Sequence, residues 1–243
     1  MSSTRSRTDE LEAVAYEFWR APEVQELDGW RLRFGHGITG RANSVWPNGF
    51  GTLPLAEKID RAEAWYRERG RPTLFQLTRA AQPAGLEDAL AQRGYELRGA
   101  PVSVEAASLD EVVARTSGEA DVTQRLDDAW LELWAGSRGF AELAAARELL
   151  TLGDAAFARV GDTAVGRGVV AHGWLGITSM VTLPDARRRG HARAIVNALA
   201  RWALSRGCTR AMLQVETTNE PARALYAGAG FVPQHEYHYR RLG

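Results

Sequence analysis

The sequence is short of cysteine, of lysine and of any excess of charge. Cys208 is the only cysteine, which excludes an intramolecular disulfide. We expect Cys208 to be a small buried residue; the alternative, an acylated nucleophile, has no histidine near it in the sequence. Lys58 is the only lysine, and 30 basic residues balance 30 acidic ones. No overall electrostatic field therefore draws the chain to nucleic acid or to an anionic lipid surface.

Long apolar runs are missing as well. No stretch approaches the roughly 20 apolar residues that span a bilayer, so no membrane partner is expected. Residues 1–10, MSSTRSRTDE, contain no apolar signal core, and we expect a cytoplasmic protein. The composition, 45% hydrophobic and 25% charged, is ordinary for a globular protein, and 243 residues suffice for one large domain or two small ones.

Residues 180–201, MVTLPDARRRGHARAIVNALAR, predict a strand, an arginine-rich turn and an amphipathic helix. Pro184 should end the strand, because proline cannot donate to a sheet ladder. Apolar residues then recur every three or four positions, which predicts a helix that begins near Arg189 or Gly190. A helix start offers unpaired N–H groups and partial positive charge, and glycine lets an anion come close. The segment therefore predicts a pyrophosphate site; the simpler alternative is a turn with solvated arginines.

A second segment, residues 219–231 (NEPARALYAGAGF), follows a predicted strand at 210–216. Pro221 suits the first turn of a helix, and Gly228 and Gly230 can end it. Asn219 precedes this helix and can cap it through its side chain.

With these two segments the chain resembles the GCN5-related N-acetyltransferases (GNAT). The acyl-CoA signature of that family, (Q/R)-x-x-G-x-(G/A) with a proline three residues ahead, is matched by Pro184, Arg187, Gly190 and Ala192. The second signature, N-x-x-A-x-x-L-Y-x-x-x-G-F, is matched by Asn219, Ala222, Leu225, Tyr226, Gly230 and Phe231. The resemblance covers roughly residues 121–243.

The resemblance implies an N-acetyltransferase that moves an acetyl group from acetyl-CoA to a primary amine by direct attack in a ternary complex. It implies a cofactor site made by the strand end, the loop and the second helix. Its members are Met180, Val181, Thr182, Arg187, Arg188, Arg189, Gly190, His191, Ala192, Arg193, Asn219 and Tyr226. It also suggests that the strand at 173–183 parts from the one at 210–216. The acceptor is a small-molecule or protein amine, no metal is needed, and a monomer or homodimer is expected.

Tyr226 is the residue we predict as the general acid. A phenol has an ordinary pKa near 10, so it stays neutral at pH 7 and can protonate a leaving thiolate. The alternative role for Tyr226 is an aromatic side chain packed on the helix face beside Leu225.

Several groups are candidates for the base that removes a proton from the amine. Many relatives place a carboxylate five positions before Asn219, where this chain has Gln214, which cannot accept a proton. Glu216 lies on the same face of a regular strand, and we predict it as the catalytic carboxylate. A chain of water molecules is an equal alternative, and His172 and His191 are further candidates.

The first half of the chain repeats the order of elements of the second half. The loop at 48–54 has no arginine where the phosphate loop would be, and Leu90 falls where Tyr226 stands. We therefore predict an α/β (α+β) protein with two GNAT-like halves, each a mixed, mostly antiparallel sheet flanked by helices. The predicted domains are a degenerate GNAT-like domain at 1–105, a connector at 106–120 and the catalytic domain at 121–243. An unrelated α/β extension is the alternative.

Two other functions compete with catalysis. A non-catalytic acyl-CoA-binding sensor on the same fold is favoured by the missing carboxylate at Gln214. A nucleic-acid-binding role for the arginines is opposed by the net neutrality of the chain.

Overall fold

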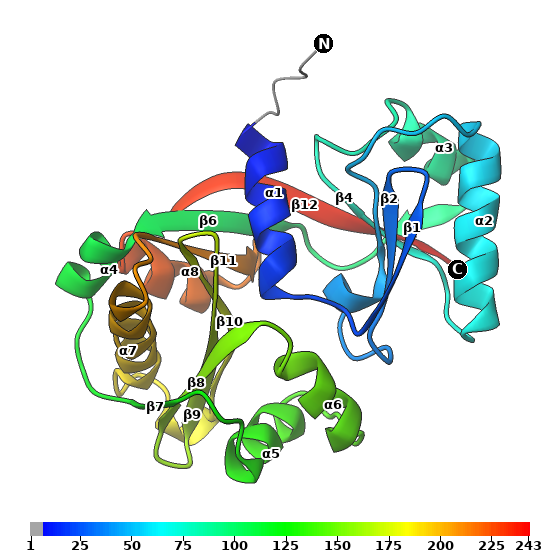
Figure 1. Cartoon of the computed structure of the whole chain (residues 1–243). Coiled ribbons are helices and arrows are strands. Elements are labelled where there is room, and N and C mark those ends of the chain that lie inside the picture. The colour runs from blue at the N-terminus through cyan, green and yellow to red at the C-terminus, as the bar shows by residue number, and fades with distance from the viewer. Residues whose placement is uncertain (1–6) are drawn as a thin grey trace. The chain divides into compact units, whose positions relative to one another are not determined.

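A computed structural model describes residues 7–243, which fall into two compact units (Figure 1). Among the described residues, unit 1 comprises 7–12, Ala21–Val102 and His235–Gly243, and unit 2 comprises Ala13–Arg20 and Ser103–Gln234. Each unit is a mixed, mostly antiparallel sheet with flanking helices. The predicted fold class is therefore confirmed.

Unit 1 has the strand order β1-β2-β3-β4-β12, with β5 paired to β12. Its strands are β1 (Glu23–Leu27), β2 (Trp30–Phe34), β3 (Val45–Trp46), β4 (Leu74–Leu77), β5 (Tyr95–Leu97) and the later part of β12 (Val232–Leu242). Its helices are the first part of α1 (Arg7–Phe18), the 3₁₀ helix η1 (Arg41–Asn43), α2 (Leu55–Glu68) and α3 (Leu86–Gln92). Pairing is antiparallel except between β3 and β4.

The core of unit 1 forms where α2 packs on the sheet. Ile59, Ala62 and Tyr66 recur at helical spacing on one face of α2 and are almost fully buried. They belong to the same apolar cluster as Trp30 and Phe75, whose rings meet edge to face at 5.4 Å.

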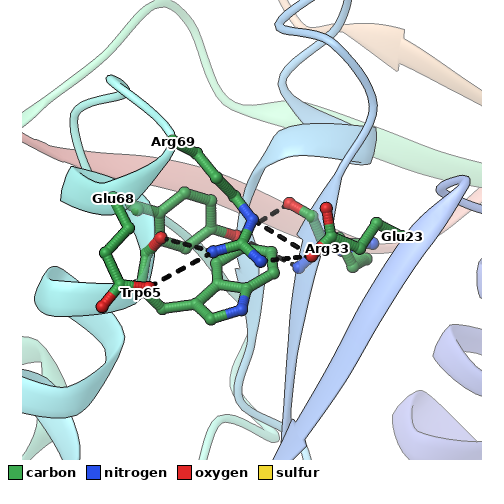
Figure 2. A network of polar contacts seen from close by, with 6 residues as sticks. Glu23, Arg33, Trp65, Glu68 and Arg69 are labelled. Atoms are coloured by element: carbon green, nitrogen blue, oxygen red, sulfur yellow. Dashed lines mark hydrogen bonds and ion pairs between the residues drawn. The ribbon is translucent and has the colours of Figure 1, made fainter.

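A polar network at the end of α2 ties this helix to the first strand of unit 1. Figure 2 shows the guanidinium of Arg69 over the indole ring of Trp65, 3.7 Å from its centroid, and directed to the carboxylate of Glu23. Arg69 also donates to the backbone oxygen of Trp65 at 2.8 Å. Tyr66 connects the helix to β2, since its hydroxyl donates to the backbone oxygen of Arg33 at 2.9 Å. These contacts are internal to unit 1 and give the polar groups of Glu23, Tyr66 and Arg69 partners within the chain.

Unit 2 has the strand order β6-β11-β10-β9-β8-β7. Its strands are β6 (Val102–Ser108), β7 (Asp121–Thr123), β8 (Asp154–Val160), β9 (Ala164–Ala171), β10 (Trp174–Thr182) and β11 (Arg210–Glu216). Its helices are α4 (Leu109–Arg115), α5 (Asp128–Gly136), α6 (Leu143–Leu150), η2 (Pro184–Ala186), α7 (His191–Ser205) and α8 (Glu220–Gly228). β10 and β11 are parallel, whereas β7, β8, β9 and β10 pair antiparallel in turn.

The core of unit 2 is built on α7, which lies along its strands (Figure 1). Ile195, Val196 and Leu199 are fully buried on the face that the sequence predicted. Burial of each such side chain contributes about 1.5–3 kcal/mol relative to exposure. Helix α7 is therefore fixed firmly to the sheet.

The segment that the sequence suggests as a charged connector, 106–120, contains the end of β6 and helix α4. Leu109 and Val112 of α4 are fully buried in the core of unit 2. A helix of 7 residues with two buried positions gives too short a periodic pattern to stand out in the sequence. The two compact units do not test the predicted domain limits, 1–105 and 121–243, which remain a prediction.

Candidate active site

The strands β10 and β11 part at the end where the sequence places the acyl-CoA contacts. Their pairing runs from Trp174 opposite Arg210 to Ile177 opposite Leu213, although β10 continues to Thr182. No further pair between them occurs within the described part of the chain. The pairing of β10 with β9 also shifts register here. Met180, Val181 and Thr182 thus lie beyond the last pair with β11, half-buried, as the resemblance implied.

The loop after β10 has the backbone conformation that a glycine permits. Gly190 precedes α7 with φ +85°, a left-handed conformation that side chains disfavour. A Cβ atom at Gly190 would meet no heavy atom within 4 Å, so the space beside this residue is open. Arg188 also has a positive φ, +66°. The helix begins at His191, within two residues of the predicted start.

The backbone N–H groups of residues 188–193 are available to a ligand. Within residues 7–243, none of them donates to a protein acceptor. The side chains of Arg188, Arg189 and Arg193 are exposed and form no ion pair in that range, while Arg187 reaches the backbone oxygen of Thr182 at 3.5 Å. The loop therefore combines free donors with uncompensated positive charge, which favours an anion.

His191 is occupied by a contact inside unit 2. Its Nδ1 lies 3.1 Å from the hydroxyl oxygen of Thr163, and that hydroxyl donates to the backbone oxygen of Val160 at 3.0 Å. The hydroxyl therefore accepts from Nδ1–H, which leaves Nε2 as the acceptor nitrogen of the neutral ring. Ala192 follows it, half-buried in the first turn of α7.

Asn219 caps helix α8, the alternative that the sequence left open. Its side-chain oxygen accepts from the backbone N–H of Ala222 at 3.3 Å, and Pro221 lies in the first turn. The contact of Asn219 with acyl-CoA stays a prediction.

Tyr226 lies inside unit 2, 7% exposed, with its ring 6.0 Å from that of Phe231. Burial raises the pKa of Tyr226 to about 12, and the nearby negative charge of Glu105 adds to the shift. The phenol is thus neutral over the physiological range, though it holds its proton more firmly than the ordinary value near 10 suggests. Its role as the acid stays a prediction.

The predicted base lies at the exposed end of β11. Glu216 is the last residue of that strand and is exposed, whereas Gln214 is half-buried two positions earlier. The catalytic role of Glu216 stays a prediction. His172 is exposed in the turn between β9 and β10, with φ +51°.

Glu105 is a buried carboxylate of unit 2 that the sequence analysis did not single out. It lies in β6, is 3% exposed, and its Oε1 lies 3.9 Å from Nε of Arg223. Burial raises the pKa of this carboxyl group. The available signal was a single acidic residue inside the apolar run 101–107, because a buried carboxylate of this kind is often functional.

Cys208 is buried, and burial raises the pKa of its thiol. A thiol that resists ionisation is a poor nucleophile, which supports its packing role. Among residues 7–243, no group of three His, Cys, Asp or Glu side chains is arranged to hold a metal ion. In the same range, no helix has the length and apolar character needed to cross a membrane.

The chain shares its order of strands and helices with solved GCN5-related N-acetyltransferases. Within this class, the chain belongs to the family described as "Probable histone acetyltransferase Rv0428c C-terminal", whose model matches residues 5–240. The class resemblance inferred from the sequence is confirmed. The chain is accordingly an acyltransferase, and its class uses acyl-CoA.

Two relatives are similar over most of the chain. "Uncharacterized N-acetyltransferase YobR" of Bacillus subtilis is 28% identical over 246 residues, which covers 95% of this chain and 96% of that protein. "Probable histone acetyltransferase Rv0428c" of Mycobacterium tuberculosis is 29% identical over 242 residues, which covers 94% of this chain and 72% of that protein.

Solved structures share the fold at lower identity. A GCN5-related N-acetyltransferase from Kribbella flavida matches with a TM-score of 0.66 at 15% identity, over 98% of this chain and 96% of that one. A tandem GNAT protein from the clavulanic acid biosynthesis pathway matches with a TM-score of 0.62 at 11% identity, over 100% and 89%. These likenesses bear on the fold of the whole chain, both units included.

Proposed function

We propose that unit 2 transfers an acetyl group from acetyl-CoA to a primary amine, by direct attack in a ternary complex. The observation that carries the proposal is the open start of α7: Gly190 has free space beside it, and the amides of residues 188–193 have no protein acceptor within the described chain.

The residues present fit acetyl-CoA. The amides of the loop, with the exposed Arg188 and Arg189, would bind the pyrophosphate. The backbone of Met180, Val181 and Thr182, past the last pair with β11, would bind the pantetheine amides like an added strand. An N–H group at the parted strands would bind the acyl oxygen as charge develops on it.

Tyr226 would act as the general acid. Its phenol would give its proton to the departing thiolate and recover one from solvent after release of the product. Burial keeps the phenol protonated before the reaction, so the acid is ready when the thiolate leaves. For the proton that the amine loses, Glu216 and a chain of water molecules are the two routes predicted from the sequence.

The experiment that tests the proposal follows the release of CoA thiol from acetyl-CoA in the presence of a panel of amines. The panel contains spermidine, glucosamine, an aminoglycoside and a lysine-bearing histone-tail peptide, the last because of the printed name of the Mycobacterium tuberculosis relative. We expect amine-dependent thiol release and a product heavier by one acetyl group. An absence of both with every amine would refute the transfer.

The second candidate function is a non-catalytic acyl-CoA sensor. It is favoured by Gln214, a neutral side chain where relatives place a carboxylate. Tight binding of acetyl-CoA in calorimetry, together with no thiol release for any amine, would support the sensor over the enzyme.

A further inference from the structure

A buried carboxylate lies beside the predicted acid of unit 2. Glu105 belongs to β6, and β6 is the sheet neighbour of β11, the strand that carries Gln214 and Glu216. Its side chain is 3% exposed, whereas Glu216 is exposed at the end of its strand. Glu105 thus lies on the strand next to β11, and β11 itself has a neutral glutamine at position 214.

The surroundings of Glu105 differ from those of a purely structural acid. Removal of a carboxylate from water is costly unless close partners satisfy it. The guanidinium of Arg223 lies 3.9 Å away, beyond hydrogen-bond distance, and Arg223 is itself exposed. By contrast, Asp28 in unit 1 accepts hydrogen bonds from the backbone N–H groups of Thr52 and Leu53, each at 2.9 Å.

Glu105 is electrostatically coupled to the predicted acid. Arg223 and Tyr226 are three residues apart on α8 and so share one face of this helix. Two groups act on Glu105, the charged guanidinium of Arg223 from α8 and, within β6, the neutral hydroxyl group of Ser103; both oppose the rise of its pKa that burial causes. The carboxylate in turn raises the pKa of Tyr226 after the larger effect of burial.

We propose that Glu105 is the base that accepts the proton of the attacking amine, a role that rests on the acetyl transfer proposed above. The nitrogen lone pair attacks the thioester carbon, so that the C–N bond forms and the C–S bond breaks. The nitrogen loses its proton to the carboxylate of Glu105, and the sulfur gains one from Tyr226. Solvent then removes the proton from Glu105 and restores the one on Tyr226, so protons balance over the cycle.

The two groups assist one another in this scheme. Once Glu105 is protonated it is neutral, and its contribution to the raised pKa of Tyr226 disappears. Tyr226 therefore becomes a stronger acid at the step in which the departing thiolate takes up a proton. The two groups are expected to titrate as a coupled pair.

The first experiment compares Glu105→Gln with Glu119→Gln, a matched change at an exposed position of the same unit. The assay uses acetyl-CoA and the amine of the panel with the highest turnover. We expect Glu105→Gln to lower kcat by about 10²- to 10⁴-fold, with acetyl-CoA affinity in calorimetry unchanged. Glu119→Gln should match the unaltered protein in both measurements.

The second experiment uses Arg223→Met, which changes an exposed side chain and leaves Glu105 in place. Loss of the positive charge raises the pKa of Glu105 further. Because the base works only when deprotonated, the fall of kcat toward acid should then occur at a higher pH than in the unaltered protein. A structural role for Glu105 would leave that limb of the pH profile unmoved.

The outcomes separate the two proposals. If the unaltered protein releases no thiol with any amine, both the transfer and the role of Glu105 are refuted. If it is active and Glu105→Gln keeps near-normal kcat, only the role of Glu105 is overturned. A large loss confined to Glu216→Gln assigns the base to Glu216. Should Glu105→Gln fail to fold, an unmoved acid limb in Arg223→Met overturns the inference.

Discussion

The two units differ in the segment that precedes a long helix, α7 in unit 2 and α2 in unit 1. In unit 2, the segment before α7 has free amides, and Gly190 has open space beside it. In unit 1, the segment before α2 is closed: a Cβ atom at Gly49 would lie 2.0 Å from the backbone oxygen of Gly29. There the carboxylate of Asp28 accepts from the amides of Thr52 and Leu53.

This difference shows how one fold keeps or loses a ligand site. Free amides near a helix start attract an anion in either unit. Unit 1 supplies the anion from its own chain, and Lys58, 3.4 Å from Asp28, balances the charge. In unit 2 the space beside Gly190 is open, and the neighbouring arginines are exposed. The degenerate first half stays a prediction; what unit 1 has is a carboxylate that accepts from the amides before α2.

The largest expected effect follows from closing the open site. Gly190→Glu places a side chain in the free space and a carboxylate against the phosphates, at a left-handed φ of +85°. Like-charge contacts cost several kcal/mol, so we expect acetyl-CoA affinity to fall by about 100-fold or more in calorimetry. Gly207→Glu is the matched control, because Gly207 has φ +78° and equally open space, at the other end of α7. Normal CoA affinity in Gly190→Glu would refute the loop assignment.

The next expected effect is on turnover and not on acetyl-CoA affinity, and it follows from removing the predicted acid of unit 2. Tyr226→Phe keeps the buried ring against Phe231 and deletes only the hydroxyl. Turnover should fall by about 10- to 10⁴-fold with little change in acetyl-CoA affinity. Tyr95→Phe removes a phenol from unit 1, where it bonds to Glu63 at 3.1 Å, and should leave turnover unchanged. Unaltered turnover in Tyr226→Phe would mean that the proton comes from elsewhere.

The sequence predicted local features of the site better than those that depend on strand neighbours. Helix α7 begins within two residues of the prediction because a glycine and apolar periodicity mark its start. Strand β11 has the predicted bounds, 210–216, since apolar and β-branched residues mark it. Glu105 was missed because the pairing of β6 with β11 joins residues about a hundred positions apart. A contact between residues so far apart in the sequence leaves no periodic pattern of apolar residues in either segment.

Two further features could not be predicted from the sequence, for the same physical reason. The strand β1 is exposed at four of its five residues, so its sequence has little apolar alternation to mark it. The ordinary pKa of a phenol is near 10, whereas burial and a neighbouring carboxylate raise the pKa of Tyr226 to about 12. Both depend on what surrounds a residue in the folded chain.

The smallest expected effect concerns the stability of the fold, and it tests the role of Asp28 in the closed segment of unit 1. Hydrogen bonds from Thr52 and Leu53 hold the pKa of Asp28 below its ordinary value. Because the folded pKa is depressed, Asp28 stabilises the fold above its unfolded pKa of about 3.9, and this contribution is lost as pH falls through the folded value. Asp28→Asn should therefore lower the melting temperature at pH 7 and flatten its decline between neutral and acid pH.

Asp88→Asn is the control for this change, since Asp88 is exposed in the same unit. The closed segment also limits what Asp28→Asn can do to ligand binding. The backbone around Gly49 and Gly29 leaves no room for a phosphate even without the carboxylate. Calorimetry should thus give the same number of acetyl-CoA molecules per chain before and after the change. A second binding event in Asp28→Asn would mean that the carboxylate alone, and not the packing of the loop, closes the site in unit 1.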